Sequence, residues 1–227
     1  MSIAVLAGTG VGAGSTDRNT VTTAAVDTTG ADLIVAVVSD FGTTRATFSD
    51  SKGNAWTPLP TTQLGTSAAC RIFWTRPTSI GSGHTFTATQ TNSFPSINVL
   101  AFSGGATSPV DQQNGATFSA VTSAQPGSIT PTENNELVVS ALTSDNQALS
   151  LSASGMTVSS NVTQTTNCER GALAYVIQTT ATAVNPTWSW TLSSNGALRS
   201  ASFKAAAASG GGTGSGYRSR YRFGDAA

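Results

Sequence analysis

The chain has 227 residues, a formal net charge of zero, 38% hydrophobic residues and only 10% charged residues. The charged share is well below the roughly 25% of ordinary soluble domains, and strong helix formers are scarce, with three Glu and two Lys. This composition argues against a mainly helical fold, and two cysteines are too few for a disulfide framework.

The charges are distributed unevenly. Residues 1–208 contain eight Lys or Arg and ten Asp or Glu, a net charge of −2, whereas residues 209–227 contain three Arg and one Asp, a net charge of +2. The body therefore lacks the broad basic field that nucleic-acid binding requires, and only the tail would attract an anionic partner.

No secretory signal or membrane segment is predicted. The start of the chain lacks a basic region, and its apolar stretch Ile3–Ala7 is short. The apolar run Leu33–Val38 is far below the roughly 20 residues that span a bilayer. We therefore expect a soluble protein that is made in a cytoplasm or released by a route other than ordinary secretion.

Residues 1–20 are predicted to form an N-terminal arm or a first strand. Within them, the segment from Gly8 to Ala13 matches the G-x-G-x-x-G/A pattern of dinucleotide sites. Such a site needs a helix immediately afterwards, whose N-terminus holds the pyrophosphate, but the sequence after Ala13 has no helical period. We therefore interpret the segment as a flexible or assembly-contacting arm and predict no cofactor.

Strand patterns recur through the rest of the chain. The runs Leu33–Val38 and Leu137–Leu142 are apolar throughout, which is typical of central strands buried on both faces. Period-two patterns predict further strands around Ile72 and Trp74, over 97–102, through Leu173, Tyr175 and Ile177, and through Trp188, Trp190 and Leu192. Turn formers separate these strands, and Asn195-Gly196 is the strongest hairpin signal because both residues tolerate a positive φ.

Several landmarks recur about 100 residues apart. The pairs are Leu33 with Leu137, Cys70 with Cys168, Phe86 with Trp190, and Phe102 with Phe203, at separations of 137 − 33 = 104, 168 − 70 = 98, 190 − 86 = 104 and 203 − 102 = 101. This internal repeat predicts two similar halves, about 21–105 and 125–205. Each half could form its own small sandwich, or the halves could interleave into one. We favour a single all-β antiparallel sandwich over 21–208, because no flexible low-complexity linker separates the halves.

His84 is the only histidine, so a catalytic triad or a histidine metal site would have to use it. It follows Gly81-Ser-Gly83 at the start of a strand, which predicts an exposed residue at the end of a loop. No G-x-S-x-G nucleophile motif is present. We predict no catalytic residues and a protein that is not an enzyme.

The segment Asp50-Ser-Lys-Gly-Asn54 contains oxygen ligands that suit Ca²⁺, but the same residue types also build hairpin turns. It has one carboxylate beside a lysine, which is a weak charge supply for a cation. Asp40, Asp111 and Asp145 would contribute only if the fold gathered them. We therefore predict a turn and no metal.

Exposed aromatic residues raise the alternative of a glycan-binding module. Trp56, beside the Asp50 turn, is the best exposed candidate, whereas the other tryptophans lie in alternating strands. The competing interpretation is an edge aromatic that caps the core. Cys70 and Cys168 fall at equivalent places of the repeat, and we expect two free, half-buried thiols.

After Phe203 the composition changes. Residues 209–216 form a Gly-rich linker, and residues 217–227 form a basic aromatic tail. The candidate partner-binding residues are Tyr217, Arg218, Arg220, Tyr221, Arg222 and Phe223. Arginine and aromatic residues are enriched in binding hot spots, and their alternation would place the arginines on one face of an added strand. The tail is therefore predicted to dock on a protein, with a disordered end or a weak nucleic-acid arm as alternatives.

Four segments carry a resemblance to a known group of proteins. Residues 50–56, 71–74, 79–86 and 99–104, the last followed by Asp111, are similar to jelly-roll-like β-sandwich domains of tailed-bacteriophage virion proteins and some bacterial surface proteins. The resemblance covers about residues 20–205 and does not include the tail.

The resemblance implies a jelly-roll-like sandwich and a decoration, fibre or adaptor role without catalysis. We expect a bacteriophage virion structural protein, a tail or fibre adaptor or a capsid decoration protein, that is made in the host cytoplasm and docks onto other virion proteins in many copies through its C-terminal arm. The alternative is a carbohydrate-binding module of a receptor-binding fibre, with Trp56 as its glycan contact.

Overall fold

The computed structural model describes residues 2–13, 19–91, 93–145, 150–161 and 170–207, with side chains omitted at 160 and 161. All regular structure in these residues is β-strand. The strands before Gly104 are β1 (Ala4–Gly12), β2 (Thr20–Thr22), β3 (Leu33–Asp40), β4 (Thr47–Asp50), β5 (Thr57–Pro58), β6 (Thr62–Gln63), β7 (Ala69–Thr75), β8 (Phe86–Thr89) and β9 (Ser96–Ser103). Those after it are β10 (Gly105–Ala124), β11 (Leu137–Ser144), β12 (Ser152–Ala153), β13 (Thr157–Asn161), β14 (Arg170–Ile177) and β15 (Trp188–Ala205).

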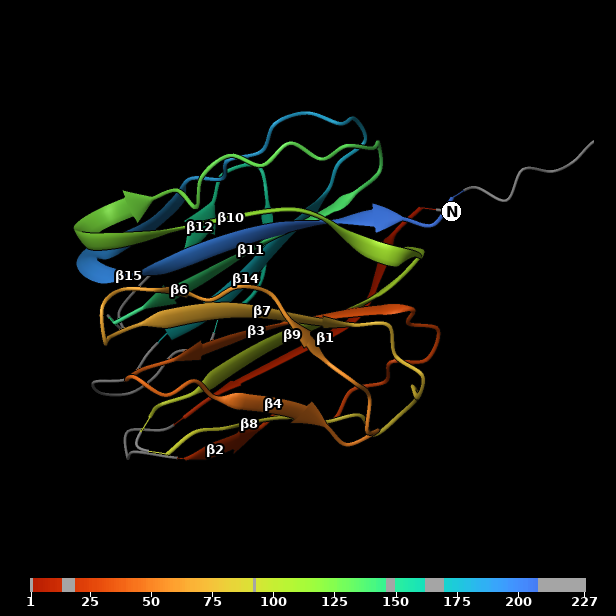
Figure 1. Ribbon diagram of the computed structural model, residues 1–227, viewed down its shortest axis with the longest axis horizontal. Helices are drawn as coiled ribbons and strands as arrows, with labels where there is room; N and C mark the ends of the chain where they lie inside the picture. The colour runs from red at the N-terminus through yellow and green to blue at the C-terminus, as the bar shows by residue number, and fades with distance from the viewer. Residues whose placement is uncertain (1, 14–18, 92, 146–149, 162–169, 208–227) are drawn as a thin grey trace, which may run out of the picture.

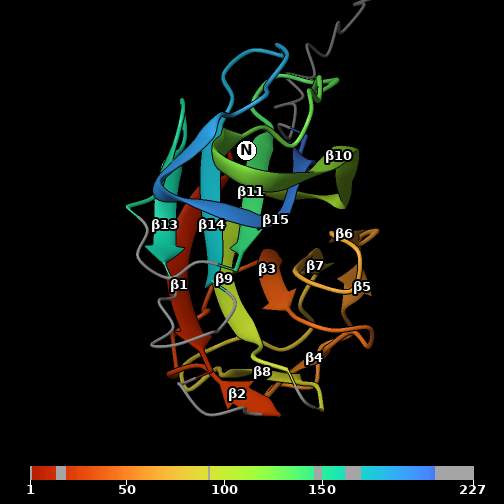
Figure 2. The ribbon, with the colours of Figure 1, turned by 90° about the vertical axis from the view of Figure 1, so that its left-hand side faces the viewer.

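The strands form three antiparallel sheets, which are stacked as layers in Figures 1 and 2. The first large sheet has the order β1-β9-β3-β7-β5, with β6 also on β7. The second large sheet has the order β10-β15-β11-β14-β13, with β12 also on β15. The small sheet has the order β2-β8-β4 and lies on the far side of the first large sheet.

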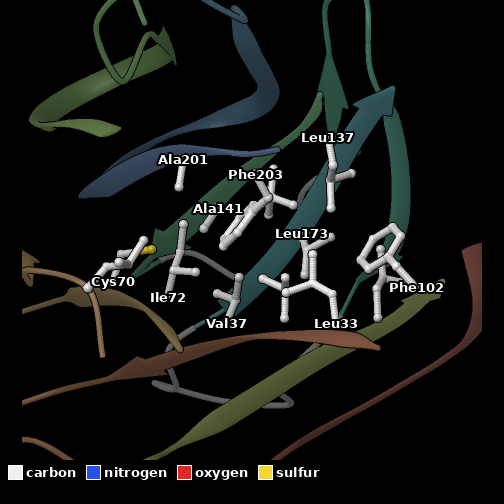
Figure 3. Packing of buried hydrophobic residues seen from close by; sticks show 14 of the residues in the cluster. Leu33, Val37, Cys70, Ile72, Phe102, Leu137, Ala141, Leu173, Ala201 and Phe203 are labelled. Carbon is white, nitrogen blue, oxygen red and sulfur yellow. The ribbon is translucent and has the colours of Figure 1, made fainter. Parts of the chain in front are cut away.

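The two large sheets pack face to face, as in a β-sandwich (Figure 3). Leu33, Ile72 and Phe102 of the first sheet meet Leu137 and Phe203 of the second. The predicted all-β antiparallel fold is thus confirmed. The expected interleaving of the halves is wrong, because every strand of the first large sheet precedes Gly104 and every strand of the second follows it.

A second core fills the space between the first large sheet and the small sheet. Successive side chains of a strand point to opposite faces, so Ile34, Ala36 and Val38 of β3 face this layer while their neighbours face the other. All of β3 is consequently buried, and so is all of β11. Both strands confirm the prediction of central strands buried on both faces.

The outer face of the second large sheet is covered by the ends of β10 and β15. Both strands are long, and their pairing shifts register between Phe118 and Ser123, so their far ends turn over the sheet together with β12. There Trp188 and Trp190 pack against the outer side chains of β11 and β14. The predicted alternation holds for the two tryptophans, but Leu192 is 46% exposed.

The hairpin predicted at Asn195-Gly196 is wrong. Both residues lie inside β15, and neither has a positive φ. A Cβ atom on Gly196 would come within 2.0 Å of the carbonyl oxygen of Thr143. The Asn195 side chain donates to Asp145 at 2.8 Å and accepts from the Ser119 hydroxyl at 2.7 Å. The two residues therefore lie where neighbouring strands pack closely, and they do not form a turn.

Within the described part of the chain, no helix is long and apolar enough to cross a membrane.

Candidate functional site

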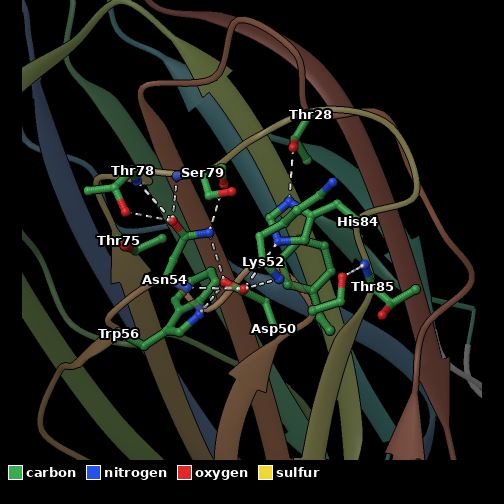
Figure 4. Close-up of polar contacts among 12 residues, drawn as sticks. Thr28, Asp50, Lys52, Asn54, Trp56, Thr75, Thr78, Ser79, His84 and Thr85 are labelled. Carbon is green, nitrogen blue, oxygen red and sulfur yellow. Dashed lines mark hydrogen bonds and ion pairs between the residues drawn. The ribbon is translucent and has the colours of Figure 1, made fainter.

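The turn after β4 is built around the carboxylate of Asp50 (Figure 4). Its Oδ1 accepts hydrogen bonds from the backbone N–H groups of Lys52 at 2.8 Å and Asn54 at 3.2 Å. Its Oδ2 accepts from Asn54 Nδ2 at 3.1 Å and from the indole N–H of Trp56 at 2.8 Å. Gly53 has a φ of +73°, which glycine adopts at little cost. The predicted turn is confirmed, and both carboxylate oxygens already accept protein donors.

Asn54 links this turn to the loop between β7 and β8. Its Oδ1 accepts from the backbone N–H groups of Thr78 at 2.8 Å and Ser79 at 2.9 Å, while its Nδ2 donates to the carbonyl oxygen of Ser79 at 2.9 Å. Two loops far apart in the sequence are thereby held together by one largely buried amide.

His84 is fully buried beside this cluster, so the prediction of an exposed loop-end residue is wrong. Its Nδ1 lies 2.9 Å from the Thr28 hydroxyl, and its ring stacks on Phe86 with 4.4 Å between the ring centres. Its Nε2 lies 3.5 Å from Asp50 Oδ1, which is long for a hydrogen bond. The overlooked signal is the spacing of two between His84 and Phe86, which places both side chains on the inner face of a strand.

Asp50, His84 and Thr28 follow one another like the acid, base and hydroxyl of a hydrolase, but their environment is different. The side chains of Asp50 and His84 are fully buried, as is Thr28. The Thr28 hydroxyl also accepts from the Gly81 N–H at 3.1 Å and donates to the Gly81 carbonyl at 3.3 Å. No substrate carbonyl can approach a hydroxyl in this position, so the group stabilises the loops.

The environment shifts both titratable groups of this cluster. Burial lowers the pKa of His84, and the nearby charge of Asp50 opposes this effect only in part. Burial would raise the pKa of Asp50, but the hydrogen bonds from Asn54, Trp56 and Lys52 outweigh it and hold that pKa below its usual range. A neutral His84 and an ionised Asp50 are therefore the favoured forms at neutral pH.

The other acidic candidates are not gathered around this turn. Asp40 pairs with Arg45 at 2.5 Å, Asp145 accepts from Asn195, and Asp111 lies 3.7 Å from Lys204. In the described residues, no group of three or more His, Cys, Asp or Glu side chains is placed to hold a metal ion. The Asp50 carboxylate is instead engaged by the backbone and side-chain donors of its own turn.

A second carboxyl cluster, which the sequence reasoning missed, lies beside the start of β11. Glu136 is fully buried and accepts the Glu133 N–H at 2.9 Å. Burial, with an added contribution from the neighbouring charge of Asp111, raises the pKa of Glu136. Asp111 accepts the Thr132 N–H at 2.8 Å, and such hydrogen bonds hold its pKa below the usual range despite burial. The signal for this pair was a glutamate directly before an apolar run.

Trp56, the candidate glycan contact, is half-buried. Its indole N–H is bonded to Asp50, and its ring meets Phe48 edge-on at 4.7 Å and Phe86 at 6.0 Å between ring centres. Both its polar atom and its ring are engaged within the protein, which is the geometry of an edge aromatic that caps a core.

Cys70 is more deeply buried than expected. Its thiol is free and fully enclosed in the core between the large sheets, and burial raises its pKa to about 12. The expectation of a half-buried thiol is wrong for this residue because β7 is a central strand. Cys168 lies outside the described residues.

The outer edge of β1 is an open edge of the first large sheet. No other described strand pairs with it, and its residues are largely exposed, with Val5 at 37% and Leu6 at 44%. Residues 2–13 contain no charged side chain. The opposite edge of the same sheet is formed by short strands, including the two-residue β5 with Pro58, which protect it from further pairing.

A groove of about 370 Å³ runs between β1 and β13, the neighbouring edge strands of the two large sheets. Its lining is mostly apolar and includes Val5, Gly8, Leu100, Val158 and Tyr175. A Cβ atom on Gly8 would lie 2.7 Å from the Leu100 side chain. The glycine pattern at 8–13 therefore lies mainly in a paired strand, where Gly8 makes room for the Leu100 side chain, and not in a loop that precedes a helix.

The last described residues lie beside the start of β1. The Ala206 N–H donates to the Gly104 carbonyl at 2.7 Å, and residues 205–207 line a hollow together with Ser2. The candidate partner-binding residues Tyr217 to Phe223 lie outside the described residues.

No family model, curated protein or solved structure matches this chain.

Proposed function

We propose that the protein is a non-enzymatic structural component of a larger assembly and that its C-terminal tail joins it to a partner protein. One observation carries this proposal: the last described strand, β15, ends at Ala205, and the sequence continues with a Gly-rich segment at 209–216 and with three arginines and three aromatic residues in 217–223. Residues of this kind provide binding energy when they are desolvated against a partner.

The proposed setting is a bacteriophage virion, with the protein as a tail or fibre adaptor or a capsid decoration protein in many copies. Support comes from the resemblance of residues 50–56, 71–74, 79–86 and 99–104 to virion sandwich domains. The side chains of Asp50 and His84 form hydrogen bonds within the protein, which is compatible with a body that acts as a scaffold. Synthesis in the host cytoplasm and the lack of a cofactor belong to the same proposal.

We further infer that the body is a duplicated jelly-roll-like unit. The orders β1-β9-β3-β7 and β10-β15-β11-β14 correspond position by position, and the order β2-β8-β4 opposite the first of them is that of a jelly roll. Leu33 pairs with Phe102 in one sheet, and Leu137 pairs with Phe203 in the other. The long β10 and β15 would then each replace two shorter strands of the first half.

Under this duplication, the counterpart of Cys70 is Gly171. Cys70 is paired with Ser39, and the residue 104 positions after Ser39 is Thr143, which is paired with Gly171. The equivalence of Cys70 and Cys168 that the sequence suggested would thus be displaced by three residues.

The experiment compares incorporation of the full chain and of a chain that ends at Ala208 into assembled particles. We expect the shortened chain to fold and to be lost from particles. A variant with Tyr217, Tyr221 and Phe223 changed to Ser keeps the arginines and tests whether charge alone suffices. Equal incorporation of the full and shortened chains would refute the proposal, and recovery of the aromatic-free variant in full amounts would favour a nucleic-acid arm.

A further inference from the structure

We propose that the outer edge of β1 receives residues 217–223 from a second copy of the chain as an added antiparallel strand. One aromatic side chain of that strand would enter the groove between β1 and β13, and the others would lie along the same face. This inference rests on the proposed function of the tail and names both its partner and its docking site.

The first support is the open edge itself. Alternate N–H and C=O groups of an edge strand point away from its sheet and can pair with another chain, and proteins usually protect such edges with charges, proline or short strands. β1 has nine residues, none of them charged and none of them proline. This edge is suited to strand addition, whereas the β5 edge of the same sheet is not.

The second support is the match between the groove and the tail. A strand added to β1 would direct every second side chain toward the second large sheet, over the groove lined by Leu100 and Tyr175. Tyr217, Tyr221 and Phe223 are all odd-numbered and would share that face, with Ser219 between them. A cavity of about 150 Å³ accommodates a benzene ring, so a groove of about 370 Å³ has room for an aromatic side chain. The three arginines would face the opposite side.

The third support concerns which copy supplies the tail. The tail leaves the body beside Ser2, at the start of β1. To dock antiparallel on its own β1, it would first have to reach the far end of a nine-residue strand, about 30 Å away. The ten residue steps from Ala207 to Tyr217 reach about 35 Å when fully extended, but their relaxed end-to-end distance is only about 17 Å. The tail of a second copy avoids this stretching.

The resulting contact is heterologous, because one copy gives its tail and the other gives its β1 edge. Repetition of such a contact produces rings or open chains, and reciprocal exchange of tails between two copies gives a closed dimer. This property suits a protein that is present in many copies along an assembly.

Sedimentation velocity of the purified full chain over a range of concentrations tests the inference. We expect species larger than the monomer, and only monomer for the chain that ends at Ala208. Val5→Lys places a charge in the groove and should weaken association by about tenfold or more. Leu192→Lys is the matched control, because Leu192 is also an exposed apolar residue but does not line the groove, and it should associate like the unchanged protein.

A direct binding assay completes the test. A labelled peptide of residues 209–227 should bind the shortened chain, bind its Val5→Lys variant about tenfold more weakly, and lose affinity when its sequence is scrambled. Equal binding to the Val5→Lys variant would overturn the β1 site, and so would a full chain that stays monomeric while the peptide fails to bind. Neither result would contradict the proposed function, which particle incorporation tests separately.

Discussion

The two large sheets have similar strand orders, but their outer faces are covered in different ways. The first is covered by the separate small sheet β2-β8-β4, whose loops are fastened by Asp50, Asn54 and His84. The second is covered by the ends of β10 and β15, where Trp188 and Trp190 are buried and their indole N–H groups bond to Ser140 and Val121 at 2.8 and 2.9 Å.

Both covers bury an apolar core, but only the first is also fastened by the ionisable groups of Asp50 and His84. The contribution of the first cover to stability should therefore vary with pH. The tryptophans of the second cover use buried area and neutral hydrogen bonds, and their contribution should not vary with pH. The following variants test this contrast, from the largest expected effect to the smallest.

Trp188→Ala should cause the largest loss. The side chain is fully buried, and its removal leaves a cavity and takes away one of the two donors to the Ser140 hydroxyl, which together should cost about 4 kcal/mol of unfolding free energy. Urea denaturation at pH 7 and pH 4.5 should give nearly the same loss. Leu192→Ala, at a 46% exposed position of the same strand, should change stability by less than about 0.5 kcal/mol. A strong pH dependence for Trp188→Ala would contradict the contrast.

Asp50→Asn should cause a smaller and pH-dependent loss, about 2 kcal/mol at pH 7, because a neutral amide replaces a charged acceptor of several hydrogen bonds. The folded pKa of Asp50 lies below 3.8, so the unfolded chain binds the proton first as the pH falls. The stabilisation is therefore complete above about pH 4 and is lost as the pH falls through the folded pKa. Urea denaturation should show the two proteins converging in acid, and a constant difference would contradict this account.

Glu136→Gln should show the opposite sign. The folded pKa of Glu136 lies above 4.5, so the folded chain binds the proton first and the ionised form costs stability at neutral pH. Glutamine resembles the protonated form, and the variant should therefore be as stable as the unchanged protein or more stable at pH 7. This advantage should shrink as the pH falls from the folded pKa toward 4.5. The contradicting result is a variant that loses stability relative to the unchanged protein, and loses more at pH 7 than at pH 4.5. That result would show that the folded protein holds Glu136 ionised.

Cys70 should be inert in the native protein, because its thiol is buried and has a pKa of about 12. In a Cys168→Ser variant, a thiol reagent at pH 8 should label no cysteine until denaturant is added, and one afterwards. Rapid native labelling would show that the interface between the large sheets opens readily.

Much of the strand content could be predicted from the sequence, because burial leaves a direct mark on composition. The runs Leu33–Val38 and Leu137–Leu142 are strands buried on both faces, and Ile72 with Trp74 share one face as expected. The turn at Asp50 was also predictable, since asparagine, aspartate and glycine favour turns for local reasons.

The errors concern features that depend on distant parts of the chain. Asn195-Gly196 has the local preference of a hairpin, but close strand packing and Asp145 keep it extended. His84 follows a glycine-rich loop, but its ring nitrogen forms a hydrogen bond with Thr28, which is more than fifty residues away in the sequence. The β1 edge and its groove could not be foreseen, because they arise where two sheets meet.

Hydrogen–deuterium exchange of the β1 amides tests the central claim most directly. At a concentration where the full chain associates, we expect exchange over residues 5–11 to be slower in the full chain than in the chain that ends at Ala208, with β5 and β6 unchanged. Equal exchange in the two proteins at this strand would contradict the docking of the tail on β1.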